Sequence, residues 1–167
     1  MPGVKVGWQG RFLEDFEVGD VYRCRYGRTI TESDNIQFTA ATHNTNQIHF
    51  NRDYGEKTGF DGCVVNSLLT LSIVVGMSVH DVSENGVALG FDEIRMPKPL
   101  YAGDTLYEET EVLAVRESRS RPQQGIVTVR TRGLNQRGDT VIELKRDILV
   151  WKRAEAPSRD VFPVAQG

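Results

Sequence analysis

One apolar stretch near the middle of the chain constrains the fold more than any other feature of the sequence. Residues 63–81 read CVVNSLLTLSIVVGMSVHD, and their apolar positions cover nearly the whole circumference of a helix. Its apolar-leaning run, Val64 to Val79, is too short for a membrane span, and polar residues such as Asn66, Ser67 and Ser72 interrupt it. It therefore predicts a long, buried helix.

The segments after this helix alternate between apolar and polar residues, as strands do. Beyond Asn85-Gly86 the alternation predicts four strands, over about residues 87–91, 105–116, 126–134 and 140–151. In the last of them the charged Arg146 falls on the same face as the apolar residues. Loops that contain Pro or Gly join the strands, which predicts an antiparallel meander.

The segment before the long helix predicts a short strand, a short helix and a polar loop. The strand follows the turn in FEVGD and ends near Arg28. Thr31 and Asp34 have the spacing of a capping box, which predicts a helix from there to about Thr42. Residues 51–62 are polar and rich in Gly, so we expect a helical turn and a loop.

This order of elements favours an α+β hotdog fold, an antiparallel sheet wrapped around one long central helix. We expect a leader over residues 1–15, a single domain over residues 16–152 and a tail over residues 153–167. One helix on a small sheet leaves sheet edges uncovered, and homodimerisation is the usual remedy.

Composition excludes several classes of partner. The net charge is −3 and the isoelectric point is about 5.6, so no electrostatic argument favours nucleic acid or an anionic membrane. Cys24 and Cys63 lie far apart and are read as reduced thiols. The first ten residues lack the apolar core of a signal peptide. These features predict a cytoplasmic protein without a membrane partner.

The polar loop that precedes the long helix, THNTNQIHF, is the strongest candidate site. It contains Asn44, Asn46 and His49, and five positions separate Asn44 from His49, which suits a curled loop. Histidine can act as acid and base near neutral pH, whereas asparagine cannot accept a proton. From composition alone, the alternative is a polar turn in which the asparagines cap the chain and His49 bonds to a backbone group.

Other kinds of site have weaker support. A metal site would need His43, His49 and His80 to converge, and no metal-ligand spacing is present, so no metal is expected. Ser67 lacks the flanking glycines of a nucleophile elbow. The backbone amides at the start of the long helix are more suggestive, because a helix N-terminus can stabilise a thioester oxyanion.

The combined motifs resemble the MaoC-like hotdog dehydratases and (R)-specific enoyl-CoA hydratases. The motif N-x-N-x-x-H-F at Asn44–Phe50, the turn at Phe60–Gly62 and the helix entry at Val65–Ser67 carry the resemblance. It covers about Phe16 to Lys152 and is nearest the branch that acts on mesaconyl-CoA, β-methylmalyl-CoA and itaconyl-CoA.

The resemblance implies hydration or dehydration of a short branched or dicarboxylic enoyl-CoA. His49 and Asn44 take the catalytic positions, and the predicted substrate-binding residues are Asn46, Val65, Asn66 and Ser67. In the family, amides at the helix entry hold the thioester oxygen. No cofactor is implied, because CoA is part of the substrate, and the expected assembly is a homodimer or a dimer of dimers.

The sequence departs from the family pattern at Asn44, where a catalytic aspartate is usual. One interpretation is a divergent, active hydratase in which His49 is the sole acid and base. Another is a protein that binds acyl-CoA without turnover. A third, a hotdog thioesterase, would use a carboxylate such as Asp61 or Glu56, and the N-x-x-H pattern argues against it.

Overall fold

The computed structural model describes residue 5, residues 7–158 and residues 161 and 163, and its elements follow the predicted order. The helices are α1 (Glu32–Ala41), α2 (Arg52–Lys57) and α3 (Ser67–Val82). The strands are β1 (Val21–Arg23), β2 (Arg28–Thr29), β3 (Gly86–Arg95), β4 (Thr105–Glu117), β5 (Gln124–Leu134) and β6 (Thr140–Trp151). Short 3-10 turns occur at η1 (Leu13–Asp15), η2 (Gln47–His49) and η3 (Arg153–Glu155).

The strands form one antiparallel sheet in the order β1-β4-β5-β6-β3, with β2 also paired to β4. The prediction of a single strand that ends near Arg28 was wrong, because this segment forms two strands, β1 and β2. Five positions separate Arg23 from Arg28, whereas their β4 partners Glu109 and Leu106 are three apart. The surplus residues bend out of the sheet and break the strand.

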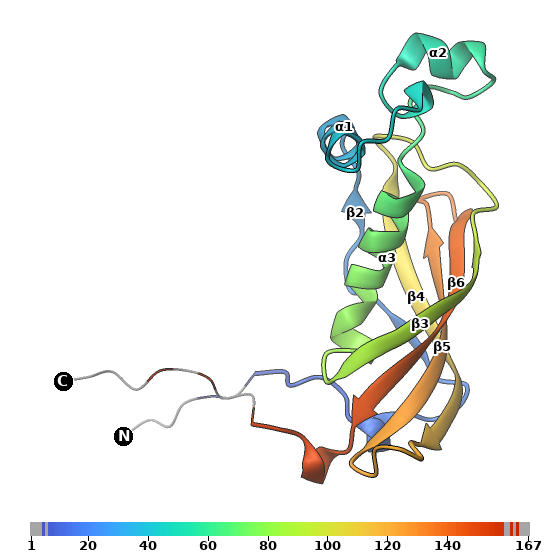
Figure 1. Ribbon diagram of the computed structural model, residues 1–167. Coiled ribbons are helices and arrows are strands. Elements are labelled where there is room, and N and C mark those ends of the chain that lie inside the picture. The colour runs from blue at the N-terminus through green and yellow to red at the C-terminus, as the bar shows by residue number, and fades with distance from the viewer. Residues whose placement is uncertain (1–4, 6, 159–160, 162, 164–167) are drawn as a thin grey trace.

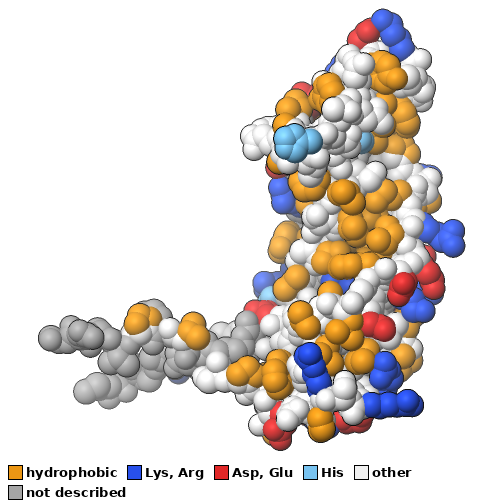
Figure 2. All heavy atoms as spheres, viewed as in Figure 1, with side chains coloured by type: hydrophobic (Ala, Val, Ile, Leu, Met, Phe, Trp, Pro, Cys, Tyr) orange, Lys and Arg blue, Asp and Glu red, His pale blue; other side chains and the backbone are white. Residues whose placement is uncertain are grey.

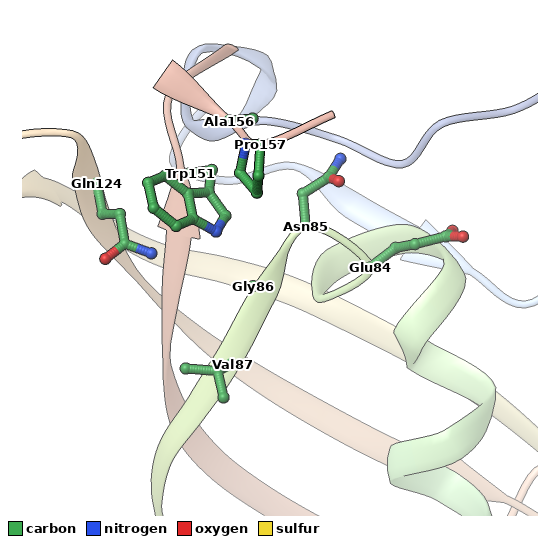
Figure 3. A pocket seen from close by; sticks show the side chains of 8 residues that line it. All are labelled: Glu84, Asn85, Gly86, Val87, Gln124, Trp151, Ala156 and Pro157. Atoms are coloured by element: carbon green, nitrogen blue, oxygen red, sulfur yellow. The ribbon is translucent and has the colours of Figure 1, made fainter. Parts of the chain in front are cut away.

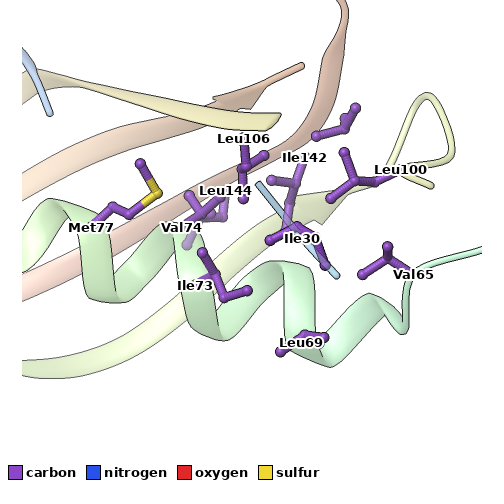
Figure 4. Close-up of a cluster of buried hydrophobic side chains, with 11 residues drawn as sticks. Ile30, Val65, Leu69, Ile73, Val74, Met77, Leu100, Leu106, Ile142 and Leu144 are labelled. Carbon is purple, nitrogen blue, oxygen red and sulfur yellow. The ribbon is translucent and has the colours of Figure 1, made fainter. Parts of the chain in front are cut away.

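The long helix α3 lies along one face of the sheet, which confirms the predicted arrangement (Figure 1). Its inner side packs on β4 and β6 through a buried apolar cluster (Figure 4). The cluster consists of Ile30, Val65, Leu69, Ile73, Val74, Met77, Leu100, Leu106, Val141, Ile142 and Leu144. Burial of this apolar surface is the main force that fixes the helix on the sheet.

The outer face of α3 is exposed in the single chain, so the predicted burial of this helix is met on its inner side alone. Leu68 and Val79 keep 56% and 39% of their surface exposed. The neighbouring edge strand β3 exposes Val87, Leu89 and Phe91. Figure 2 shows hydrophobic side chains gathered over the middle of this face. The apolar pattern that looked all-round therefore has one side facing the sheet and another available to a second protein surface.

Two charged side chains lie inside the sheet–helix interface. Arg146 on β6 is 1% exposed, as its place on the apolar face predicted, and Glu108 on β4 is 4% exposed. Arg146 donates a hydrogen bond to Ser78 of α3, and Thr110 donates one to Glu108. Burial raises the pKa of Glu108 to about 7, although Thr110 and the Arg146 charge oppose the shift.

The N-terminal segment and the short helix α1 are fixed by specific side chains. The Trp8 indole N–H donates a hydrogen bond to the His80 carbonyl, and Leu13 is buried beside the sheet. The domain limits at residues 15 and 152 stay predictions. At α1 the capping box is confirmed: Asp34 N–H donates to Thr31 Oγ1 at 3.0 Å, and Thr31 N–H donates to Asp34 Oδ2 at 2.9 Å. Within the described ranges, no helix is both long and apolar enough to cross a membrane.

Candidate functional site

The loop between α1 and α2 is shaped by its own asparagines. Asn44 Oδ1 accepts from Asn46 N–H at 3.0 Å, and Asn46 Oδ1 accepts from Ile48 N–H at 3.3 Å at the start of η2. His43 takes a left-handed backbone conformation with φ of 53°, which reverses the chain after α1. The capping role that the turn interpretation assigned to the asparagines is therefore present. The Asn44 Nδ2 group is not used in these bonds.

His49 is buried and held in one tautomer. His49 is 7% exposed, and its ring nitrogen Nδ1 is 2.9 Å from the Val64 carbonyl oxygen. Because a carbonyl can only accept, Nδ1 carries the hydrogen, and the neutral ring then presents the lone pair of Nε2. The arrangement leaves Nε2 as a proton acceptor of fixed orientation.

A buried asparagine that the sequence did not single out ties the site together. Asn35 on α1 is 1% exposed, and its Nδ2 donates to the carbonyls of His49 at 2.8 Å and Val64 at 3.1 Å. Its Oδ1 accepts from Asn66 N–H at 2.7 Å. One side chain thus links the histidine, the carbonyl that orients it and the start of α3. Its partners are remote in sequence, so no local pattern could have identified it.

A cavity of about 110 Å³, here the His49 cavity, opens beside the ring. Its lining residues are Glu32, Asn35, Ile36, His49, Phe50, Arg52 and Cys63. It is small compared with sites for drug-sized ligands, so it has room for a small group only. Asn44 does not line it. The cavity carries one ion pair, in which Arg52 Nη2 lies 2.6 Å from Glu32 Oε1.

The start of α3 presents one free amide among the three predicted there. Val65 N–H donates to Leu100 O at 2.7 Å, and Asn66 N–H donates to Asn35. Asn66 is the N-cap and accepts from Leu68 N–H at 3.0 Å. Ser67 N–H donates to no described residue, so it is the amide that can bind a ligand oxygen.

Ser67 faces a second cavity of about 240 Å³, here the helix-start cavity. It is lined by Phe60, Val64, Val65, Ser67, Thr70, Met96, Lys98, Pro99, Leu100 and Val141. The two cavities share no lining residue. In the single chain, the Ser67 amide and the His49 ring are therefore not brought into one cavity.

The alternative sites lack support in the geometry. No group of three or more potential metal ligands occurs among the residues that the structure describes. Asp61 and Glu56, the thioesterase candidates, are exposed and line neither cavity. A cavity of about 220 Å³ near Trp151 and Gln124 lies at the C-terminal end of α3, the end remote from Ser67 (Figure 3).

Comparison with known proteins identifies the family of the chain. A family model described as mesaconyl-CoA hydratase matches residues 4–160. Mesaconyl-CoA hydratase of Cereibacter sphaeroides is 35% identical over 93% of this chain and 46% of its own length. β-Methylmalyl-CoA dehydratase of Chloroflexus aurantiacus is 32% identical over 86% of this chain and 41% of its own length. The chain thus spans about half the length of the curated relatives it matches.

Solved structures confirm the hotdog fold. A MaoC domain dehydratase from Chloroflexus aurantiacus superposes with a TM-score of 0.85 and 30% identity, over 98% of this chain and 47% of its own. A MaoC-like dehydratase from Rhodospirillum rubrum has a TM-score of 0.78 and 28% identity, over 86% of this chain and 99% of its own. A Mycobacterium tuberculosis protein with a double hotdog fold, at 20% identity and a TM-score of 0.80, supports the fold alone.

Proposed function

We propose that this chain, which belongs to the mesaconyl-CoA hydratase family, adds or removes water across the 2,3 double bond of a short branched or dicarboxylic enoyl-CoA. The observation that carries the proposal is the tautomer of His49, whose Nδ1–H is held by Val64 O at 2.9 Å. That bond leaves Nε2 able to accept a proton from water. The names of the relatives support the substrate class.

His49 acts as base and then as acid in the proposed reaction. Nε2 removes a proton from water while the water oxygen bonds to the β carbon, and the π electrons move toward the α carbon and the thioester oxygen. The imidazolium then returns the proton to the α carbon, so no proton or electron is gained or lost. The reverse sequence is dehydration. The reaction needs no metal or cofactor besides the CoA of the substrate.

Asn44 and the start of α3 take supporting roles. Asn44 does not line the His49 cavity in the single chain, so its proposed role is to contribute its unused Nδ2 donors to the water or substrate once the second unit completes the site. Ser67 N–H, with the partial positive charge of the α3 N-terminus, stabilises the enolate oxygen. Asn46 shapes the loop, and Val65 and Asn66 place the Ser67 amide through their own bonds to Leu100 and Asn35.

A second hotdog unit completes the proposed site. Two observations support this: the single chain holds His49 and Ser67 in separate cavities, and the outer face of α3 is exposed. The relatives that are about twice as long could supply the second unit within one chain. For this chain we propose a second copy, giving a homodimer or a dimer of dimers in the cytoplasm.

Hydration can be followed as loss of enoyl-thioester absorbance. His49→Ala should abolish it, with a loss on the order of 10²–10⁴ in kcat. His43→Asn is the matched control, because His43 is exposed, lies in the same loop and has a backbone that asparagine tolerates. Equal turnover by His49→Ala and wild type would overturn the role of His49. Asn44→Asp should preserve or raise activity if the amide only substitutes for the usual carboxylate.

The absence of a carboxylate at Asn44 favours one alternative, an acyl-CoA-binding protein without turnover. Binding of CoA esters with no hydration across a substrate panel would support it over the hydratase. Release of free CoA thiol, detected with a thiol-reactive dye, would instead identify a thioesterase.

A further inference from the structure

The His49 cavity contains a cation that the proposed acid–base chemistry does not use. Arg52 from α2 lines it together with His49, and the other lining residues include the apolar Ile36 and Phe50. The field of Arg52 reaches the cavity wall: burial raises the pKa of the Cys63 thiol, and the Arg52 charge offsets part of that rise. A positive group therefore lies where the acyl part of a substrate would enter.

The Arg52 guanidinium forms one ion pair and has free donors. Arg52 follows the N-cap Asn51, whose Oδ1 accepts from Tyr54 N–H at 3.2 Å and fixes the start of α2. The Nη1 atom of Arg52 lies close to Gly62, because a Cβ added at Gly62 would be 3.4 Å from that atom. Among the described residues only Glu32 accepts from the guanidinium, through Nη2, so most of its five N–H groups stay available.

Substrate chemistry places a negative charge close to His49. In a four-carbon dicarboxylic enoyl-CoA, the free carboxylate is attached to the β carbon that water attacks. When Nε2 of His49 is within reach of that water, the carboxylate must lie in the same small cavity. A planar guanidinium can bind it through two parallel hydrogen bonds. Lys98, the cation of the helix-start cavity, is paired with Asp139 and lines a different space.

We infer that Arg52 binds the free carboxylate of a dicarboxylic enoyl-CoA in the His49 cavity and thereby selects such substrates over neutral ones. The inference rests on the proposed hydratase function and names its substrate class. In the free protein Arg52 and Glu32 form a surface ion pair at 2.6 Å, with side chains 62% and 61% exposed, so the guanidinium lies on the solvent-facing side of the cavity. The substrate carboxylate shares or replaces this bond, so Glu32 competes with the substrate for Arg52.

The test compares mesaconyl-CoA with the neutral crotonyl-CoA in steady-state hydration. Arg52→Gln should lower kcat/KM for mesaconyl-CoA relative to crotonyl-CoA by about 10- to 100-fold, mostly through KM, since a charge-assisted hydrogen bond is lost. Arg52→Lys should fall between Arg52→Gln and wild type, because it keeps the charge but loses the planar fork. Glu32→Gln should lower KM for mesaconyl-CoA. Lys57→Gln, which removes an exposed cation from the same helix, should leave kcat/KM unchanged for both substrates.

The outcomes separate this inference from the proposed function. Wild type that hydrates neither thioester would overturn the function, whereas equal losses for both substrates in Arg52→Gln would overturn the role of Arg52. Calorimetric binding of succinyl-CoA and butyryl-CoA, two unreactive analogues, tests Arg52 without turnover. Arg52→Gln should weaken the binding of succinyl-CoA and leave the binding of butyryl-CoA unchanged. An unchanged preference for succinyl-CoA would reject the inference.

Discussion

Replacing Asn35 with leucine should destabilise the protein and misplace His49 together. The change removes three hydrogen bonds, to His49 O at 2.8 Å, to Val64 O at 3.1 Å and from Asn66 N–H at 2.7 Å. Each contributes about 1 kcal/mol net, and buried backbone groups left unpaired cost more. Because Asn35 is 1% exposed, water cannot replace these bonds without rearrangement. We expect a loss of about 3–5 kcal/mol in the free energy of unfolding.

Urea unfolding followed by circular dichroism measures this loss, with the m-value as a check on two-state behaviour. Gln37→Ala is the matched control on α1, since Gln37 is exposed and bonds only to Ser33, and its effect should stay within about 0.5 kcal/mol. Where the variant folds, kcat should fall because the Val64 carbonyl no longer fixes the His49 tautomer. A loss below about 1 kcal/mol would refute the reasoning that Asn35 ties the site.

Three further predictions follow from burial and close contacts. The pKa of Glu108 is raised from 4.5 to about 7, so the folded state holds this proton more tightly. The contribution of Glu108 to the free energy of unfolding should be fully present below pH 4.5 and fall by about 3 kcal/mol as the pH rises through 7. Urea titrations across that window should show a smaller decrease with pH for Glu108→Gln than for wild type, and an identical pH dependence of the two would contradict this. Gly55→Ala should cost at least about 2 kcal/mol by thermal melting, because its Cβ would lie 2.4 Å from the Gly62 carbonyl oxygen; an unchanged Tm would contradict this. Leu68→Glu, on the exposed face of α3, should shift the mass in sedimentation toward a single chain, and an unchanged mass would place the second unit elsewhere.

Local patterns predicted most elements because their causes are local. The capping box at Thr31 and Asp34 placed the start of α1, and the alternation of residues 140–151 placed Arg146 on the buried face. The first strand was wrong because its break depends on register against β4, about 80 residues away. The predicted burial of α3 is one-sided in the single chain, because the apolar pattern does not show which face the sheet covers and which face is left for a second protein surface.

The candidate site divides in the same way. The motif at Asn44–Phe50 was visible because its residues are adjacent, and the loop bonds of Asn44 and Asn46 are short-range. Asn35 and Arg52 were not visible. Asn35 bonds to residues 14, 29 and 31 positions away, and Arg52 pairs with Glu32 20 positions away. Neither residue differs by type or spacing from an ordinary surface polar residue.

The sequence by itself determined the hotdog architecture, because hydrophobic periodicity specifies one long helix and the antiparallel strands that bury it. It also determined the family and the loop that carries His49. Only the tertiary structure decided that Val64 O holds Nδ1 of His49, that Ser67 has the free amide at the start of α3, and that a cation lies in the His49 cavity. These features depend on contacts between distant segments, whose geometry is set by packing of the whole core and not by any local pattern.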